Sequence, residues 1–394
     1  MQTALKAIFW ISILLLAYNY VAYPLLIYVL SRVFGRKQVP ADPADETLPS
    51  VSLLIAAHNE EDVISERIQN ALALDYPRDK LEIVIASDGS TDGTNEIVER
   101  FAGREVVLLA FAQNRGKSTV LNDAINRLRG EIVMLSDANT MMDRMAARRL
   151  ARWFQDSKIG AVCGKLELYD SQGSRNADGF YWKYENLIKR CEGYLGGVLG
   201  ANGAIYAIRR SVYQQIPSDT LIDDFTIPLL ARLRTGCGIA YDRDAIAFEE
   251  TAPDIHAEFR RRARIGAGGF QALARLWPLM HPRFGWTAFT FFSHKVLRWL
   301  SPFFLVAILL SNILLARDVQ YGALLAAQVV FYGLALIGNH WSFSGRIGRV
   351  LRLPTLFTAV NAALAVGFGR WLLHQQTGTW NRTRRLPIPP VHAL

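Results

Sequence analysis

The stretch EIVMLSDANT, residues 131–140, decides the fold class, because an apolar run stops abruptly in it at Ser-Asp-Ala-Asn. Three other runs share its length and its Val, Ile and Leu content: VSLLIAA (51–57), LEIVIAS (81–87) and EVVLLAF (105–111). Continuous apolar runs, as opposed to alternating ones, are typical of parallel strands that are buried on both faces. The four runs therefore predict strands of one mostly parallel sheet.

Helix-like segments separate these runs, at about 60–74, 92–102, 117–129 and 143–156. Strands that alternate with helices indicate an open α/β sheet, as in Rossmann-like folds. Residues 157–281 are mixed and mostly polar, and we expect them to complete the same domain.

The composition points to a membrane protein. The chain is 51% hydrophobic and 20% charged, which is more apolar than an ordinary soluble domain. Its three cysteines, Cys163, Cys191 and Cys237, lie far apart, which argues against a disulfide framework and for a reducing compartment. The formal net charge of +9 lies beside apolar segments, so we expect a membrane surface and no nucleic acid as its partner.

Residues 7–30 carry no formal charge over 24 residues, which is enough to span a bilayer. Arg32, Arg36 and Lys37 follow without an acid, so the positive-inside rule places the next segment in the cytoplasm. We expect a multi-pass protein of the bacterial cytoplasmic (inner) membrane, with its α/β domain in the cytoplasm.

The C-terminal part is apolar again. Residues 299–316 and 319–345 predict two spans, whereas 353–369 is short and contains Pro354, Asn361 and Gly367, which makes it doubtful as a span. Residues 282–298 combine aromatic residues with cations, as in a helix that lies in the membrane interface. The expected segments are an N-terminal transmembrane helix (1–37), a linker (38–50), a cytoplasmic α/β domain (51–281), the interfacial helix (282–298), transmembrane helices (299–375) and a cytoplasmic tail (376–394).

Polar residues follow three of the predicted strands. The first strand ends in Ala57-His58-Asn59-Glu60, the second in Ser87-Asp88, and the fourth in Ser136-Asp137-Ala138-Asn139. Ligands of open α/β sheets bind beyond the carboxyl ends of the strands, so these side chains should meet in one crevice. Each of them could alternatively cap a helix.

Carboxylates beside helix N-termini suit a divalent cation, Mg²⁺ or Mn²⁺, and a phosphate. Asn114-Arg115-Gly116-Lys117-Ser118 begins another helix, and Lys117 could hold a diphosphate there or be a solvated cation in a turn.

The segments AAHNE, SDGSTDGT (87–94), NRGKS (114–118) and SDAN (136–139) resemble, in this order, the membrane-embedded family 2 glycosyltransferases. That family has a GT-A fold and includes cellulose, hyaluronan, chitin and poly-N-acetylglucosamine synthases. The resemblance extends from about residue 50 to about 385 and implies an α/β GT-A catalytic domain with transmembrane helices at both ends.

The resemblance implies a role for each matched residue. Ala57, Glu60 and Asp88 match positions that hold the nucleotide, with Asn59 beside them, and Lys117 matches a diphosphate contact. Asp137 and Asn139 match the two acids of the metal-binding DxD element. The second acid is an asparagine here, which can ligate through its carbonyl oxygen but brings no negative charge.

The acceptor side also resembles the family. Asn202 lies in the segment that matches the glycine-containing acceptor segment. Asp223 and Asp224 match the acidic pair that carries the catalytic base. Inverting transfer needs a carboxylate to take the proton of the acceptor hydroxyl. Asp224 aligns better as this base, and Asp223 competes with it. A helix N-cap is the structural alternative for the pair.

Two later elements can be compared with the polymerising members of the family: the first differs from their pattern, and the second resembles it. The Gln-x-x-Arg-Trp element reads Arg261-Arg262-Ala263-Arg264-Ile265 here. Arg261 and Arg264 can still bind a diphosphate, but the aromatic platform for an acceptor sugar is lost, which puts processive synthesis in doubt. Trp380 and Arg384 resemble a tail of chitin and hyaluronan synthases that lies on the cytoplasmic side. Three C-terminal spans would place this tail outside, so we expect that 353–369 does not cross.

We therefore predict an inverting, metal-dependent glycosyltransferase (a hexosyltransferase) that acts in cell-surface glycan synthesis. Its partners would be a nucleotide-sugar donor, expected to be UDP-linked, a lipid-linked or glycan acceptor, membrane lipids and either further copies of itself or an export partner. A transferase that loads a single sugar onto polyprenyl phosphate and a catalytically inactive nucleotide-binding regulator stay open as alternatives. A transporter is disfavoured, because the expected spans other than the doubtful ones lack an acid or base.

Overall fold

A computed structural model of the 394-residue chain describes residues 1–37, 39–103, 106–169, 179–250, 255–340 and 345–376. They form two compact units. The α/β unit contains residues 27–253 and 274–290, and the helical unit contains residues 1–26, 254–273 and 291–376.

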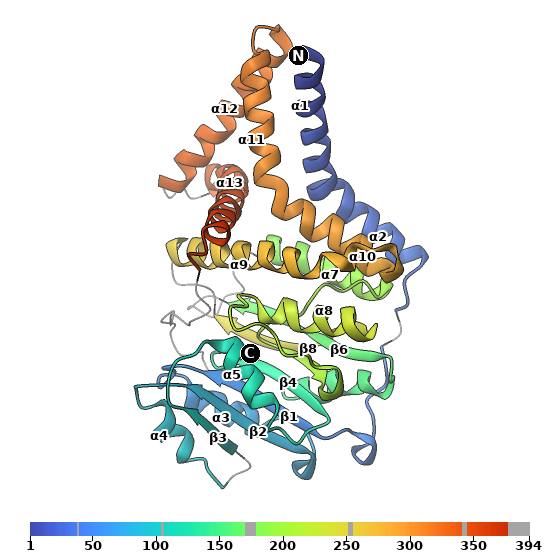
Figure 1. Ribbon diagram of the computed structural model, residues 1–394, viewed down its shortest axis with the longest axis vertical. Coiled ribbons are helices and arrows are strands. Elements are labelled where there is room, and N and C mark those ends of the chain that lie inside the picture. Colours follow the sequence, from blue (N-terminus) through green and yellow to red (C-terminus); the bar gives the residue numbers. More distant parts are fainter. Residues whose placement is uncertain (38, 104–105, 170–178, 251–254, 341–344, 377–394) are drawn as a thin grey trace. The chain divides into compact units, whose positions relative to one another are not determined.

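The α/β unit is built on one eight-stranded sheet in the order β3-β2-β1-β4-β7-β6-β8-β5 (Figure 1). β3, β2, β1 and β4 are parallel, β7 is antiparallel to β4 and β6, β8 is parallel to β6, and β5 is antiparallel to β8. The predicted mostly parallel sheet is thus confirmed. The strands are β1 (Val51–Ala57), β2 (Leu81–Asp88), β3 (Val106–Phe111), β4 (Ile132–Asp137), β5 (Met141–Met142), β6 (Ile159–Tyr169), β7 (Tyr206–Arg209) and β8 (Gly238–Glu250).

Helices follow the strands as the sequence predicted. In the α/β unit they are α3 (Ile64–Leu72), α4 (Thr94–Glu99), α5 (Lys117–Ile125), α6 (Ala146–Ala151), α7 (Gly179–Leu195) and α8 (Asp223–Thr235). β1 lies between β2 and β4, and all seven of its residues are buried. This burial on both faces explains why its sequence is continuously apolar.

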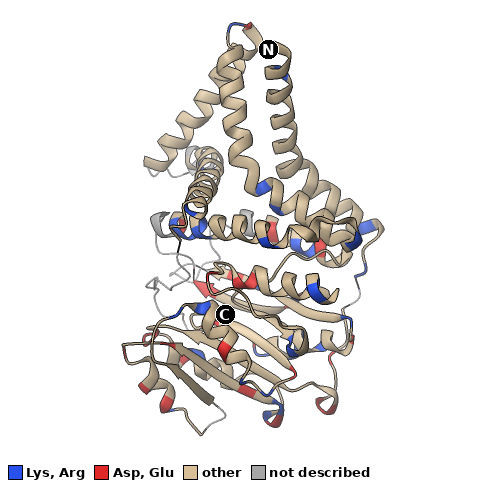
Figure 2. Cartoon of the chain, viewed as in Figure 1, with Lys and Arg blue, Asp and Glu red and all other residues tan. Residues whose placement is uncertain are grey.

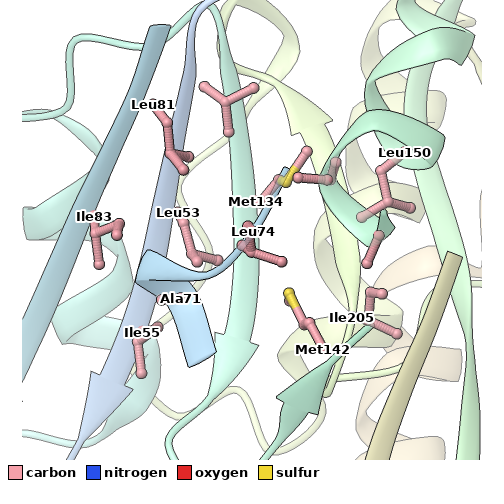
Figure 3. Close-up of a cluster of buried hydrophobic side chains, with 14 of the residues drawn as sticks. Leu53, Ile55, Ala71, Leu74, Leu81, Ile83, Met134, Met142, Leu150 and Ile205 are labelled. Carbon is pink, nitrogen blue, oxygen red and sulfur yellow. The ribbon is translucent and has the colours of Figure 1, made fainter. Parts of the chain in front are cut away.

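The core of the α/β unit forms between the sheet and its helices. Figure 3 shows Leu53 and Ile55 of β1, Ile83 of β2 and Met134 of β4 in this cluster. Each is almost completely buried, and burying a side chain of this size contributes about 1.5–3 kcal/mol. The core thereby fixes the strand ends that carry the polar residues.

The described part of the predicted linker packs against the α/β unit. Lys80 Nζ donates to the carbonyl oxygens of Asp45 and Glu46, both at 2.8 Å. Arg148 pairs with Asp45 at 2.6 Å, and Arg152 pairs with Asp42 at 3.0 Å. These contacts hold residues 42–46 in place, so this stretch is part of the folded unit.

The helical unit contains most of the long apolar helices. Four stretches are long and apolar enough to cross a membrane: residues 2–33, 286–315, 319–340 and 350–372. Figure 2 shows α1, α11 and α12 almost free of charged residues along their middle. The other α-helices of the described residues are α1 (Gln2–Ala17), α2 (Tyr23–Val33), α9 (Ile255–Leu276), α10 (Trp286–Thr290), α11 (Leu297–Leu315), α12 (Val319–His340) and α13 (Gly345–Leu372).

Two details differ from the sequence prediction. Residues 286–298 continue directly into α11 instead of ending as a separate helix, and their position in the membrane interface stays a prediction. The doubtful span 353–369 lies within α13, where 23 residues, 350–372, are long and apolar enough to cross. Its shortness is therefore no longer an argument against crossing, and the sidedness of the tail stays a prediction.

Candidate active site

The polar ends of β1, β2 and β4 lie at the same edge of the sheet. In the strand register Ala56 lies beside Asp137, and Ala57 lies beside Ser87. Asp88 and Asp137 therefore flank the end of β1 from its two sides. The strand ends therefore converge at one edge of the sheet, and the crevice itself stays a prediction.

Lys117 lies among three carboxylates at this edge. Its Nζ is 2.7 Å from Asp137 Oδ1 and 3.2 Å from Asp223 Oδ2. Burial alone would lower the pKa of Lys117, but the charges of Asp137, Asp223 and Asp224 outweigh it and raise the pKa well above its ordinary value. The ammonium group is therefore a permanent cation in this cluster.

Asp224 is held by a backbone amide. The N–H of Gly203 donates to Asp224 Oδ2 at 3.0 Å. A Cβ placed on Gly203 would lie 3.3 Å from Asp137 Oδ2 and 3.7 Å from Asp224 Oδ2, so both carboxylates border the same spot. Burial and then the charge of Asp223 raise the pKa of Asp224 to about 6, against the opposing charge of Lys117. Asp224 is thus a carboxylate that can accept a proton near neutral pH.

Asp88 organises the loop that leads to Lys117. Its side chain is fully buried, and its two oxygens accept the backbone N–H groups of Arg115 and Gly116, each at 2.8 Å. Gly116 has φ +86°, a conformation that glycine adopts without strain. In this structure the carboxylate of Asp88 therefore supports the start of α5.

The end of β1 is tied to the loop after β2. Asn59, with φ +55°, accepts the N–H of Thr91 on its Oδ1 at 2.8 Å. The N–H of Glu60 donates to Thr94 Oγ1 at 2.8 Å, while the side chain of Ala57 is buried in the core. Asn59 and Glu60 thus lie at the predicted edge, and their proposed contacts with a nucleotide stay predictions.

Asn202 belongs to a polar contact that the sequence did not reveal. Its Oδ1 accepts a hydrogen bond from Lys189 Nζ at 2.8 Å, and its Nδ2 donates to the carbonyl oxygen of Gly164 at 3.0 Å. Lys189 lies in α7 outside any motif. Its charge lowers the pKa of Asp224, opposing the effects of burial and Asp223.

A second cation that sequence reasoning missed is Arg67 in α3. It is fully buried, and its Nη1 donates to Asn70 Oδ1 at 3.0 Å. Burial lowers its pKa to about 9, and the charge of Asp137 opposes that change. Arg67 therefore contributes positive charge to the surroundings of Asp137.

The proposed metal ligands Asp137 and Asn139 offer oxygen atoms that suit a hard cation. Asn139 Nδ2 donates to Glu249 Oε1 at 3.1 Å, which leaves the amide oxygen as the ligating atom. Among the described residues no group of three or more His, Cys, Asp or Glu side chains is placed to hold a metal ion. The residues fit Mg²⁺ or Mn²⁺ if a ligand phosphate completes the coordination, as is usual for Mg²⁺.

The remaining predicted residues lie in the other unit or outside the described residues. Arg261 and Arg264 lie in α9, which belongs to the helical unit up to residue 273. Arg261 pairs with Glu258 at 3.4 Å, and Arg264 is exposed. Trp380 and Arg384 lie outside the described residues.

Comparison with known proteins shows what this domain is similar to. Residues 52–217 match the family model described as glycosyl transferase family 2. The poly-beta-1,6-N-acetyl-D-glucosamine synthase of Staphylococcus aureus is 28% identical over 243 residues, 58% of this chain and 57% of that protein. A Bacillus subtilis protein described as "Probable glycosyltransferase YdaM" is 27% identical over 294 residues, 70% of this chain and 67% of that protein. The chain thus spans little more than half the length of the synthase it matches.

Among solved structures, the mannosyltransferase PcManGT from Pyrobaculum calidifontis, in complex with GDP-Man and Mn²⁺, has a TM-score of 0.69. It is 24% identical, and the likeness covers 94% of this chain and 99% of PcManGT. This likeness confirms the predicted fold class. Residues 52–217 are therefore similar to the family 2 glycosyltransferases, and the chain has the GT-A fold.

Proposed function

We propose that the protein is an inverting, metal-dependent glycosyltransferase of a membrane. It would transfer a sugar from a nucleoside diphosphate sugar to a lipid-linked or saccharide acceptor in cell-surface glycan synthesis. The observation that carries this proposal is the cluster of Lys117, Asp137, Asp223 and Asp224 at the edge of a GT-A sheet, with Gly203 beside Asp137 and Asp224.

Asp224 is the proposed base. A carboxylate with a pKa of about 6 is mostly ionised at neutral pH and still basic enough to accept a proton. It would take the proton of the acceptor hydroxyl while the acceptor oxygen forms its bond to the anomeric carbon. The bond from that carbon to the diphosphate oxygen breaks on the opposite face, and the electron pair leaves with the diphosphate. Asp223, paired with Lys117, is less suited to this role.

The leaving diphosphate would be received by Lys117 and the backbone N–H groups at the start of α5. Asp88 accepts the N–H groups of Arg115 and Gly116 and thereby fixes the loop that leads into α5. Asp137 and Asn139 would hold Mg²⁺ or Mn²⁺, which supplies Lewis-acid stabilisation of the diphosphate when bound. The solved structure of PcManGT is a complex with GDP-Man and Mn²⁺, which supports a divalent cation here.

The membrane location is supported by four helices that are long and apolar enough to cross. We place the domain on the cytoplasmic side of a bacterial inner membrane, since Arg32, Arg36 and Lys37 follow the first of these helices. The acceptor would then be reached at the membrane surface. Ile265 stands where polymerising members have an aromatic residue, which favours addition of one or a few sugars over a long polymer.

One experiment tests the proposal. Full-length protein in detergent or lipid discs is incubated with radiolabelled UDP-sugars and GDP-mannose, with Mn²⁺, Mg²⁺ or EDTA, and with extracted polyprenyl phosphates. The expected product is a labelled lipid or short glycan that depends on the metal. A long polymer would favour a synthase, and a single lipid adduct a lipid-loading enzyme. Nucleotide binding with neither transfer nor donor hydrolysis would contradict the enzyme assignment.

Asp224→Asn is the variant that tests the base. It should lower transfer by about 10²- to 10⁴-fold and leave nucleotide binding unchanged. Asp79→Asn, an exposed acid of the same unit, is the matched control and should retain full activity. Undiminished transfer by Asp224→Asn would show that the base lies elsewhere.

A further inference from the structure

Asn139 has a buried carboxylate as its neighbour. Its Nδ2 lies 3.1 Å from Oε1 of Glu249, and Glu249 is only 7% exposed. The antiparallel pairing of Met141 with Phe248 brings the loop after β4 against the end of β8. The contact is therefore built by the sheet itself, across 110 positions of sequence.

The chemistry of the pair fixes how the amide is turned. An ionised carboxylate only accepts hydrogen bonds, so the NH₂ group of Asn139 must face Glu249. The carbonyl oxygen then lies at the other end of the amide group. Within the described part of the chain, this Oδ1 has no hydrogen-bond partner. A cation that needs oxygen ligands can therefore use it without breaking an existing hydrogen bond.

The pair also restores the charge that asparagine lacks. Two aspartates would give a DxD element two negative charges, whereas Asp137 and Asn139 give it one. Glu249 adds one negative charge at hydrogen-bond distance from Asn139. Glu249 is buried, so water and salt screen its charge less than that of an exposed acid, and the charge acts at short range on a cation beside Asn139.

We propose that Glu249 is a positioning residue of the metal site: it holds the Asn139 amide so that its oxygen is available to the cation, and it supplies the missing charge. This inference rests on the proposed metal dependence of the transferase. The role of the second acid in a DxD element would then be shared by Asn139 and Glu249, which come from different parts of the sheet.

The test measures metal binding directly. Full-length protein in detergent is titrated with Mn²⁺ alone, and again with UDP or GDP, and free Mn²⁺ is followed by its electron paramagnetic resonance signal, corrected for nucleotide-bound metal. Glu249→Gln, which removes the charge and permits the amide to turn, should weaken Mn²⁺ binding about 10- to 100-fold. Glu250→Gln is the matched control, because neighbouring strand residues point to opposite faces, and it should bind like the wild type.

The double variant Asn139→Asp with Glu249→Gln moves the charge from position 249 to position 139. It should regain Mn²⁺ binding to within about threefold of the wild type, since second-shell orientation matters less once the ligand itself is ionised. Should Glu249→Gln not fold, Glu249→Asp keeps the charge but withdraws it from Asn139, and should also weaken binding.

The outcomes separate the two claims. Equal Mn²⁺ affinity of wild type and Glu249→Gln overturns the role of Glu249 and leaves the proposed metal dependence intact. A wild type that binds no Mn²⁺, with or without nucleotide, overturns the metal dependence and this inference with it. A double variant as weak as Glu249→Gln overturns the charge argument.

Discussion

The ammonium nitrogen of Lys117 lies 2.7 Å from Oδ1 of Asp137, so a cation from the start of α5 is paired with the acid that ends β4. This ion pair links the loop that we propose binds the diphosphate to the residue that we propose binds the metal. A bound donor with its metal would bring a negative diphosphate for Lys117 and a positive ion for Asp137. The two side chains could then give up their mutual ion pair without leaving either buried charge unpaired.

Replacing Lys117 should change the pH dependence of transfer. Lys117 opposes the effects that raise the pKa of Asp224 to about 6. Lys117→Met should move that pKa upward, so the rise of kcat/KM with pH should shift to higher pH, and the plateau should fall about 10²- to 10³-fold with the loss of a diphosphate donor. Lys158→Met, at an exposed position, should leave the pH profile unchanged. An unshifted profile in Lys117→Met would contradict the electrostatic coupling.

Asp224 should make the protein less stable at neutral pH. Its pKa is about 6 in the folded chain and 3.8 as the ordinary value, so the folded state binds the proton more tightly. This tighter proton binding contributes to the free energy of unfolding. The contribution is fully present below about pH 4 and is lost as the pH rises to about 6. Asp224→Asn should therefore raise the free energy of unfolding at pH 7.5 by up to about 3 kcal/mol.

Thermal unfolding of Asp224→Asn and wild type at pH 7.5 and at pH 4.5 measures this difference. The gain in Tm should be present at the higher pH and largely absent at the lower one. A gain of the same size at both values would mean that the effect does not come from the charge of Asp224.

Asp88→Asn should loosen the loop before α5. Asp88 accepts two backbone N–H groups, and an asparagine would direct its NH₂ toward one of them. We expect a loss of about 1–3 kcal/mol of stability and faster hydrogen exchange at Arg115 and Gly116. Ser90→Ala, in the neighbouring loop, is the variant with which the stability and the hydrogen exchange of Asp88→Asn are compared. Unchanged exchange at both amides in Asp88→Asn would rule out the supporting role.

Asp242 should be a main determinant of stability in the α/β unit. It is fully buried and accepts two hydrogen bonds from the Arg152 guanidinium, at 2.8 and 3.0 Å, and one from Trp153 Nε1 at 2.7 Å. Asp242→Ala leaves Arg152 without its main partner, so we expect a loss of about 3–5 kcal/mol, measured by denaturant unfolding. Asp244→Ala removes a more exposed acid 3.5 Å from the same arginine and should cost less than about 1 kcal/mol. Similar losses in both variants would contradict this assignment.

The central strands could be predicted from the sequence because burial on both faces leaves a local signal. β1 has the predicted bounds, and β2 and β4 each extend one residue beyond the predicted end. β7, with four residues, and β8, with partly exposed positions, leave no comparable run in the sequence. Their place in the sheet depends on pairing with strands far away in the chain, which local patterns do not encode.

The same distinction separates the predicted from the missed site residues. Lys117, Asp137, Asp223 and Asp224 lie in recognisable segments, and the structure brings them together. Lys189 and Glu249 approach the site only through contacts between distant parts of the chain, so no spacing in the sequence announces them. The nucleotide-binding roles of Asn59 and Glu60 stay predictions.

The attachment of residues 42–46 to the α/β unit matters for anyone who wishes to study that unit without its membrane helices. A fragment that starts at Val51, where the sheet begins, would lose Asp42 and Asp45 as partners of Arg152 and Arg148, and the carbonyl groups that Lys80 binds. A fragment that starts just before Asp42 would keep them. The more soluble and protease-resistant preparation should therefore be the longer one, although the added residues belong to neither a helix of the membrane part nor a strand of the sheet.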